Sequence, residues 1–463
     1  MFDEKIDNYK NEIINSLCEL IKFKSVSIET ENPEMPFGEP CKNALDYTLN
    51  LAENLGFRTK NLDGYCGYIE FGEGTEIVGI LGHLDVVPAD TKDGWRTKPF
   101  EANIRDNRIY GRGAIDDKGP VIASLFAMKA VLDSGIKLSK RVRLILGLNE
   151  EKSWKCIKHY KEIGEKTPVI GFSPDADFPC IYAEKGILSL RIHHPFIIKN
   201  MEILDIDCQN NALNVVPKYC SITLKYTTRD NRPVFENAEN ISVENIDFDT
   251  IKINSHGISA HAAHPELGQN AITQLINYLN SHLDKSLSEN EFTLLSKLAE
   301  LGIFDITSPK FLSKEKIEDE SGILTSNVGH ISYEKNRLEL GFNLRVPVNT
   351  PLDKIKVKYL ELQEIFGDLE IHFTAEQSPL FVPKDSHLVT TLTNIFNKKS
   401  GQNASPIAIG GGTYARAFPN CVAFGANMPG HQDMCHQVDE FINIDTLILS
   451  SKIYAEAIYE LGK

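Results

Sequence analysis

The sequence predicts an α/β fold with a mostly parallel central sheet, plus an inserted α+β domain. Three short apolar runs, Ile77 to Leu81, Val142 to Leu148 and Val169 to Phe172, alternate with helical patterns such as Val121 to Leu132. This alternation is typical of parallel strands joined by helices. After about Gly186, several segments have an apolar residue at every second position. This pattern indicates half-exposed strands of an antiparallel sheet.

The remaining elements follow from the same periodicities. Apolar residues at helical spacing predict an amphipathic opening helix over residues 3–22. In the inserted region we expect strands over 188–192, 221–226 and 337–348, and helices near 268–283, 290–302 and 351–365. The α/β pattern then returns, with a helix near 386–399 and a closing helix from about Ile444.

This order of elements predicts a catalytic domain built from both ends of the chain. Its two parts span 1–186 and 381–463, and the inserted domain, here called the lid domain, spans 187–380. The insert is nearly twice as long as one small α+β unit of roughly 100 residues. We therefore expect it to contain two similar α+β halves.

Composition excludes several classes of protein. Of 463 residues, 42% are hydrophobic and 24% charged, which argues against wholesale disorder. The net charge of −15, with no basic patch, argues against nucleic-acid and anionic-membrane partners. Nine cysteines without a C-x-x-C pair fit a reducing cytosol better than a disulfide framework. With no apolar leader or membrane-length apolar run, we expect a cytoplasmic protein.

Acidic residues and histidines gather where the three apolar runs stop. Such strand ends meet at one edge of a parallel sheet, and clustered carboxylates repel one another unless a cation binds them. A lone histidine is more often structural, and an adjacent glutamate pair is more often solvated surface. The joint pattern favours a divalent-metal site with oxygen and nitrogen ligands. Its candidates are His83, Asp85, Asp116, Asp117, Glu150, Glu151, Asp175, Asp177 and His436.

The motifs resemble those of the zinc metallopeptidase superfamily of aminoacylase, succinyl-diaminopimelate desuccinylase and carnosinase. The resemblance begins with Gly82 to Pro88, the loop Gly111 to Gly119 and the pair Glu150-Glu151. Further motifs are similar to the PepV-type dipeptidase branch: Gly171 to Pro179, Ser259-Ala260-His261, Pro265 to Ala271 and Gly410 to Arg416. The chain departs from the family at Lys152-Ser153, where a small residue and then glycine or asparagine are usual, so the shape of this loop stays open.

The resemblance implies a role for each candidate. His83 and Asp175 would bind one metal ion, Glu151 and His436 a second, and Asp116 would bridge both. The choice of Asp175 over Asp177 rests on the resemblance alone. Asp85 would orient His83, and Glu150 would be the general base. A cis peptide is expected between Asp116 and Asp117. Zn²⁺ is the expected ion, although such ligands also accept Mn²⁺ or Co²⁺.

The resemblance also implies substrate contacts in and beside the lid domain. His261 would close over the site and stabilise an oxyanion, and Arg345 would bind the carboxylate of the substrate. Asn214 would contact substrate, as would the backbone of Gly411, Gly412 and Thr413. Each residue also has a plainer alternative. His261 could be a surface histidine, Arg345 a charge at a strand edge, and Asn214 a turn residue. The glycine run could be only a flexible turn.

The function implied is hydrolysis of dipeptides by a monomeric enzyme with two metal ions. An N-acyl amino acid amidohydrolase or a carboxypeptidase would use the same ligands and remains an alternative. A metal-binding protein without catalysis is a third possibility. An intact Asp85 and Glu150 argue against it, because binding alone requires no base beside the ligand.

Overall fold

The computed structural model describes residues 1–198, 200–209, 212–228, 233–283 and 293–463. These residues form two compact units. Unit 1 comprises Met1–Tyr182, Phe381–Ile407 and Thr413–Lys463, and unit 2 comprises Ala183–Leu380 and Ala408–Gly412. Residues 408–412 thus join unit 2, whereas the sequence analysis placed them in the catalytic domain. The backbone explains the difference, because the Lys185 N–H donates to the Ile409 carbonyl over 3.0 Å.

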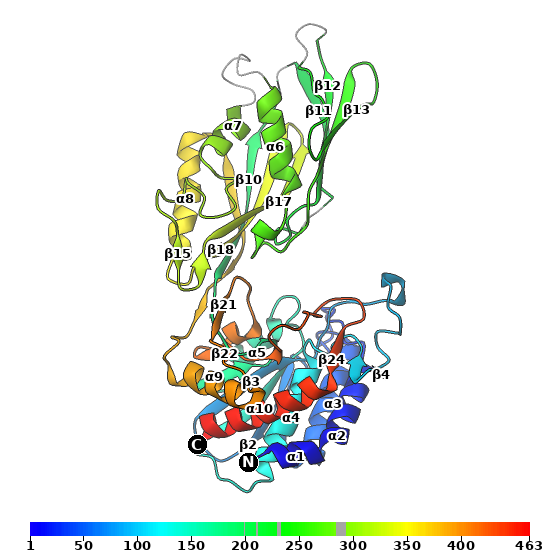
Figure 1. Ribbon diagram of the computed structural model, residues 1–463, viewed down its shortest axis with the longest axis vertical. Helices are drawn as coiled ribbons and strands as arrows, with labels where there is room; N and C mark the ends of the chain where they lie inside the picture. The colour runs from blue at the N-terminus through cyan, green and yellow to red at the C-terminus, as the bar shows by residue number, and fades with distance from the viewer. Residues whose placement is uncertain (199, 210–211, 229–232, 284–292) are drawn as a thin grey trace. The chain divides into compact units, whose positions relative to one another are not determined.

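A nine-stranded sheet has most of its strands in unit 1, where its parallel strands form the centre (Figure 1). Its inner strands β6, β3, β7 and β22 are parallel, as expected. The pairs β1–β2, β2–β6 and β22–β9 are antiparallel, so the sheet is mixed. The strand order is β1 (Arg58–Leu62), β2 (Cys66–Phe71), β6 (Arg141–Gly147), β3 (Ile77–His83), β7 (Ile170–Ser173), β22 (Cys421–Ala423), β9 (Ile181–Glu184) and β20 (Leu380–Phe381), with β21 (Ile407–Ile409) paired to β9.

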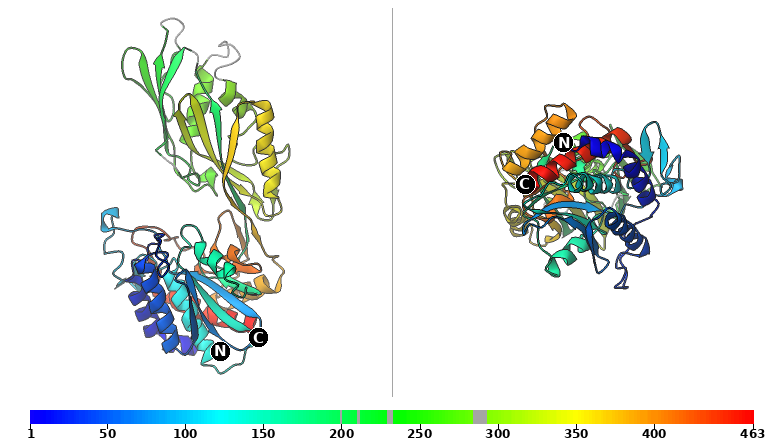
Figure 2. Two further views of the ribbon diagram at one scale, coloured as in Figure 1. Left: turned by 180° about the vertical axis from the view of Figure 1, so that it is seen from behind. Right: turned by 90° about the horizontal axis from the view of Figure 1, so that it is seen from below.

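Helices cover both faces of this sheet. The helices of unit 1 are α1 (Asp3–Asn8), α2 (Lys10–Ile21), α3 (Glu39–Asn54), α4 (Lys118–Leu132), α5 (Lys155–Glu162), α9 (His387–Ser400) and α10 (Ile444–Gly462). Helix α4 is apolar nearly all round because it lies between the sheet and α10 (Figures 1 and 2). The opening helix predicted over 3–22 is instead two helices, which meet at Tyr9.

Strand register shows which face each helix covers. Val121 of α4 packs against Gly82 of β3, and Gly82 pairs with Leu146 of β6. Tyr160 of α5 contacts Arg143 of the same strand. Residues 143 and 146 point to opposite faces of a strand. The helices α4 and α5 therefore lie on opposite sides of the sheet.

Two small sheets and two short 3₁₀ helices complete unit 1. One sheet has the order β24 (Phe441–Asn443), β5 (Arg108–Tyr110), β4 (Asn103–Arg105), and the other pairs β23 (Ala426–Asn427) with β8 (Ala176–Asp177). The 3₁₀ helices are η1 (Thr91–Asp93) and η3 (Tyr414–Ala417). Both small sheets pair a strand of the C-terminal segment with a strand from residues 103–177, and this brings residues distant in sequence together.

The described residues of unit 2 form two four-stranded antiparallel sheets. The first has the order β17 (Thr325–Glu334), β18 (Arg337–Val346), β10 (Gly186–Pro195), β19 (Glu370–Gln377), and the second β11 (Met201–Asp207), β12 (Tyr219–Tyr226), β14 (Thr250–His256), β13 (Ile241–Asn245). The other elements are the hairpin β15 (Glu318–Asp319) and β16 (Gly322–Ile323), η2 (Pro265–Leu267), α6 (Ala271–His282), α7 (Thr293–Glu300) and α8 (Leu352–Ile365).

The alternation expected for this region is clear in β10. Leu188, Leu190 and Ile192 are buried in one hydrophobic core shared by both sheets of unit 2, while Arg191 and His193 on the other face are half-buried. For the helix predicted near 290–302, residues 290–292 lie outside the described residues. Within the described ranges, no helix combines the length and apolarity needed to cross a membrane.

Candidate metal centre

Three neighbouring parallel strands of unit 1 deliver candidate residues to one edge of the sheet. His83 is the last residue of β3, the Glu150-Glu151 pair follows β6, and Asp175 follows β7. Because β3 pairs in parallel with both β6 and β7, the carboxyl ends of these strands meet. The expectation that residues at the ends of parallel strands meet at one edge of the sheet is therefore confirmed for these side chains.

Asp116 lies between two histidines that come from distant parts of the chain. Its Oδ1 is 3.1 Å from Nε2 of His83, and its Oδ2 is 3.0 Å from Nε2 of His436. The same nitrogen of His436 is 3.1 Å from Oε1 of Glu151. Each carboxylate oxygen of Asp116 thus faces a different imidazole, which is the arrangement expected of a bridging ligand.

The side of Asp116 that faces His83 also includes Asp175 and Glu150. Oδ2 of Asp175 is 3.4 Å from Nε2 of His83, whereas Asp177 is exposed in β8. His83, Glu150 and Asp175 form one group of ligand atoms within 4.8 Å of one another, and His83, Asp116 and Glu151 form a second. The structure thus brings all five proposed ligands, and the proposed base, into one cluster.

The hydrogen bond at Nδ1 of His83 leaves Nε2 as its candidate ligand atom. Its Nδ1 is 2.9 Å from the carbonyl oxygen of Asp85, which can only accept, so Nδ1 carries the proton. In the neutral ring, which is the form that binds a cation, Nε2 presents its lone pair. This nitrogen is buried and makes no hydrogen bond of ordinary geometry, although two carboxylate oxygens lie beside it. A divalent cation satisfies such a set of imidazole and carboxylate donors, so the residues fit the implied metal.

Asp85 contacts more than the predicted histidine. Its carboxylate lies 3.6 Å from Nδ1 of His83, farther than its own carbonyl oxygen. The two carboxylate oxygens accept the backbone N–H groups of Glu150 and Glu151 over 3.0 and 3.2 Å. Asp85 therefore fixes the glutamate pair as well as the histidine, a contact that the motif alone did not indicate.

Burial perturbs the acid expected to act as base. It raises the pKa of Glu150 well above the ordinary value, His83 opposes the rise, and the charges of Asp175 and Glu151 add to it. A raised pKa makes the carboxylate a stronger base than an ordinary glutamate, which favours acceptance of a proton from water. The Asp116–Asp117 peptide is cis, as the resemblance implied. The Asp117 carboxylate accepts the backbone N–H of His83 over 3.0 Å.

The candidates in unit 2 form a separate group within that unit. Val215 and His261 form a β-bridge, and the Ala262 N–H donates to the Asn214 carbonyl over 2.9 Å. Arg345 is buried, and its Nη1 donates to the Gly410 carbonyl over 3.0 Å. Partial burial and the positive charge of Arg345 lower the pKa of His261, which favours the neutral imidazole.

The glycine loop itself is divided between the two units. Gly411 and Gly412 belong to unit 2, and Thr413 belongs to unit 1. The Thr413 hydroxyl accepts the Ala415 N–H over 3.3 Å and so caps η3. Within unit 2, a Cβ at Gly410 would lie 2.8 Å from Cβ of Ala263. Glycine at 410 thus permits a close approach to the segment that carries His261.

Two residues that the sequence analysis did not single out bind the loops of the metal centre. Glu440 and Arg112 are buried and form an ion pair of 2.6 Å. Arg112 lies inside the quoted loop Gly111 to Gly119, but only the fold shows that it meets Glu440. Residues 112 and 440 are 328 positions apart, so no local pattern could pair them.

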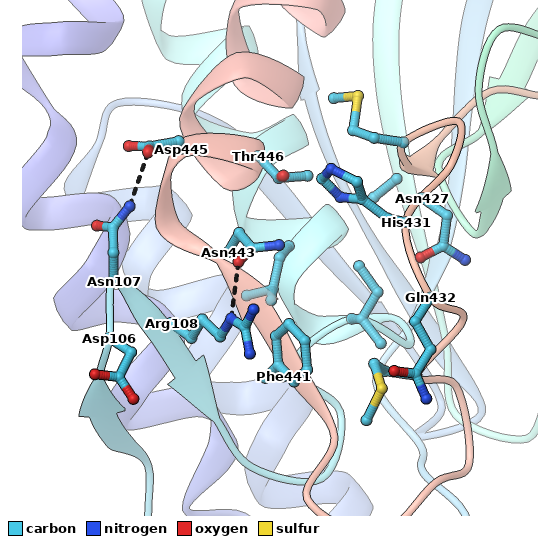
Figure 3. A pocket seen from close by; sticks show the side chains of 15 residues that line it. Asp106, Asn107, Arg108, Asn427, His431, Gln432, Phe441, Asn443, Asp445 and Thr446 are labelled. Atoms are coloured by element: carbon cyan, nitrogen blue, oxygen red, sulfur yellow. Dashed lines mark hydrogen bonds between the residues drawn. The ribbon is translucent and has the colours of Figure 1, made fainter.

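A cavity of about 490 Å³ lies elsewhere in unit 1. Figure 3 shows Arg108 directed at Asn443 beside Phe441, and the Arg108 Nε donates to Asn443 over 3.1 Å. Ile115 and Met434 line this cavity too, and they neighbour the loops of Asp116 and His436. None of the proposed metal ligands lines it, so it is distinct from the metal centre.

Comparison with known proteins identifies relatives over the whole chain. A model of the family described as peptidase family M20/M25/M40 matches residues 79–460. A Bacillus subtilis (strain 168) protein named "Putative dipeptidase YtjP" is 38% identical over 465 residues, covering 98% of both chains. A Staphylococcus epidermidis protein named "Putative dipeptidase" is 34% identical, covering 100% of this chain and 99% of its own.

Solved structures share the fold at low sequence identity. Human carnosine dipeptidase 1 matches with a TM-score of 0.60 and 15% identity, covering 100% of this chain and 98% of that one. The di-peptidase Dug1p of Saccharomyces cerevisiae matches with a TM-score of 0.59 and 13% identity, at the same coverage. These likenesses concern the fold, while the family match and the full-length relatives establish descent. The chain belongs to peptidase family M20/M25/M40.

Proposed function

We propose that this chain is a dipeptidase that uses two divalent cations, with Zn²⁺ the expected ion and Mn²⁺ or Co²⁺ as alternatives. The observation that carries the proposal is the position of Asp116, whose two oxygens face His83 and His436 separately. The full-length relatives named as dipeptidases support the choice of substrate. In this proposal His83 and Asp175 hold one cation, Glu151 and His436 hold the other, and Asp116 bridges them.

The residues of the chain have distinct tasks in the proposed reaction. Two bound cations would supply Lewis acidity, polarising the scissile carbonyl and lowering the pKa of the attacking water. Glu150 accepts the proton of that water and passes it to the leaving amine. Asp85 keeps Glu150 and Glu151 in place through their backbone N–H groups. The adjacency of the two glutamates follows from this division, because one holds a cation while its neighbour faces the water.

Residues of unit 2 and of the glycine loop complete the proposal. His261 stabilises the oxyanion, and Arg345 binds the carboxylate of the dipeptide. Asn214, Gly411, Gly412 and Thr413 contact the substrate. The lowered pKa of His261 suits a neutral donor.

We also propose that the enzyme is monomeric and cytoplasmic. Light scattering that shows an obligate dimer would contradict the proposal that the enzyme is a monomer.

The substrate class is tested with matched pairs of dipeptides, one free and one N-acetylated. A dipeptidase hydrolyses the free member faster, whereas an N-acyl amino acid amidohydrolase or a carboxypeptidase prefers the acetylated one. Each pair is assayed with Zn²⁺, Mn²⁺ and Co²⁺ supplied in turn, since availability rather than affinity selects among such ions. Preference for the acetylated member with every ion would replace the dipeptidase proposal by its alternative.

A further inference from the structure

Glu440 binds the loop of the bridging aspartate through its backbone. The carboxylate of Glu440 accepts N–H groups from Gly113 over 3.1 Å, Ile115 over 2.9 Å and Asp116 over 3.3 Å. Its own carbonyl accepts the Gly111 N–H over 3.0 Å. Glu440 is completely buried, so water does not compete for these bonds. One side chain therefore fixes the backbone path that places Asp116.

Arg112 connects the same carboxylate to the loop of His436. Its Nη1 is 2.6 Å from Oε2 of Glu440, and its Nη2 donates to the His436 carbonyl over 3.3 Å. His436 has a φ of 63°, a left-handed conformation that is uncommon for a residue other than glycine. The hydrogen bond from Arg112 is a contact that holds the backbone at this residue.

We propose that Arg112 and Glu440 are positioning residues that set the separation and orientation of Asp116 and His436. In the proposed function neither residue is a metal ligand or a substrate contact. Their contacts are to the backbone of the two segments whose side chains converge at 3.0 Å. The inference rests on the proposed metal centre, but it is independent of which peptide or acyl compound is the substrate.

Substitution of Arg112 or Glu440 should mainly change the affinity of the site for its cations. Partners that orient a ligand typically change metal affinity by about 10–100-fold when they are mutated. Glu440→Gln retains the size of the side chain, but its amide replaces an acceptor with a donor that faces backbone N–H groups. Arg112→Lys keeps the positive charge but loses the fork that reaches Glu440 and His436 together. Both substitutions should weaken the cation held by His436 more than the cation held by His83.

The chain offers a matched control at a second buried ion pair of unit 1. Arg143 and Glu70 are 3% and 5% exposed, and Nη2 of Arg143 is 2.7 Å from Oε2 of Glu70. They face each other on β6 and β2 and contact none of the candidate ligands. Glu70→Gln and Arg143→Lys therefore reproduce the loss of a buried pair without disturbing the metal centre.

The test measures metal affinity of full-length protein by dialysis against graded chelator with Zn²⁺, followed by elemental analysis. Thermal unfolding of the metal-free proteins is recorded in parallel. Both sets of variants should lower the melting temperature, but only Glu440→Gln and Arg112→Lys should weaken one of two sites by about 10–100-fold. Excess Zn²⁺ should restore much of their turnover.

Affinities equal to wild type in Glu440→Gln and Arg112→Lys would overturn the inference, as would an equal loss in the control pair. If Glu440→Gln does not fold, Arg112→Lys decides the matter by the same criterion. Failure of the wild-type protein to bind any cation would instead refute the proposed function, so the two failures are distinguishable.

Discussion

Replacement of Glu150 by glutamine should abolish proton transfer while leaving metal binding intact, so it separates the two roles of the site. The backbone N–H of Glu150 donates to the Asp85 carboxylate over 3.0 Å. Because residue 150 takes part in this bond through its backbone alone, the glutamine side chain should occupy the same position. Glutamine cannot accept the proton of the attacking water. Loss of a general base lowers the rate by about 10²–10⁴-fold, or about 2.7–5.4 kcal/mol at 1.36 kcal/mol per factor of ten.

The assay compares kcat and metal content of Glu150→Gln with those of wild type on one good dipeptide. Glu162→Gln is the control, because that acid is 59% exposed on α5 and should be neutral in both measurements. Glu150 also lies in the ligand-atom group of His83 and Asp175, which makes metal content informative. Near-normal kcat would remove Glu150 as the base, and loss of a cation would make it a ligand instead.

Two further predictions concern unit 2 and the core. His261→Ala should lower kcat by about 10²–10³-fold, with a smaller effect on KM and unchanged metal content, because an oxyanion donor acts mainly in the transition state. Steady-state kinetics with an unchanged kcat would exclude that role. Ile80→Ala should destabilise unit 1 by about 2–5 kcal/mol, since Ile80 is fully buried in β3. Urea unfolding measures this, and Ile104→Ala at a 52% exposed position should change stability by about 0.5 kcal/mol or less.

The inner strands of the sheet could be predicted because both of their faces are covered. All seven residues of β3 are buried, so the strand is an uninterrupted apolar run that ends at the first functional side chain. The edge strand β1 has the opposite character. Its residues Arg58, Lys60 and Asn61 are exposed, and such a polar sequence has no periodicity that distinguishes a strand from a loop. The antiparallel strand at this edge of the sheet therefore could not be predicted from the sequence.

The same contrast holds at the site. His83, Glu150 and Asp175 could be predicted because each lies at the carboxyl end of a recognisable strand or within three residues of it. The contacts of Arg112 and Glu440 could not, because they depend on how β24 pairs with β5 and brings the C-terminal segment beside the glycine-rich loop. The break between α1 and α2 at Tyr9 also escaped prediction, since the apolar spacing continues across it.

Elemental analysis coupled to turnover is the most direct test of a two-cation site bridged by Asp116. The fully active protein should contain two divalent cations per chain. Chelation should remove both and abolish dipeptide hydrolysis, and added Zn²⁺, Mn²⁺ or Co²⁺ should restore it. Full activity in protein that contains no bound cation would contradict the proposed mechanism.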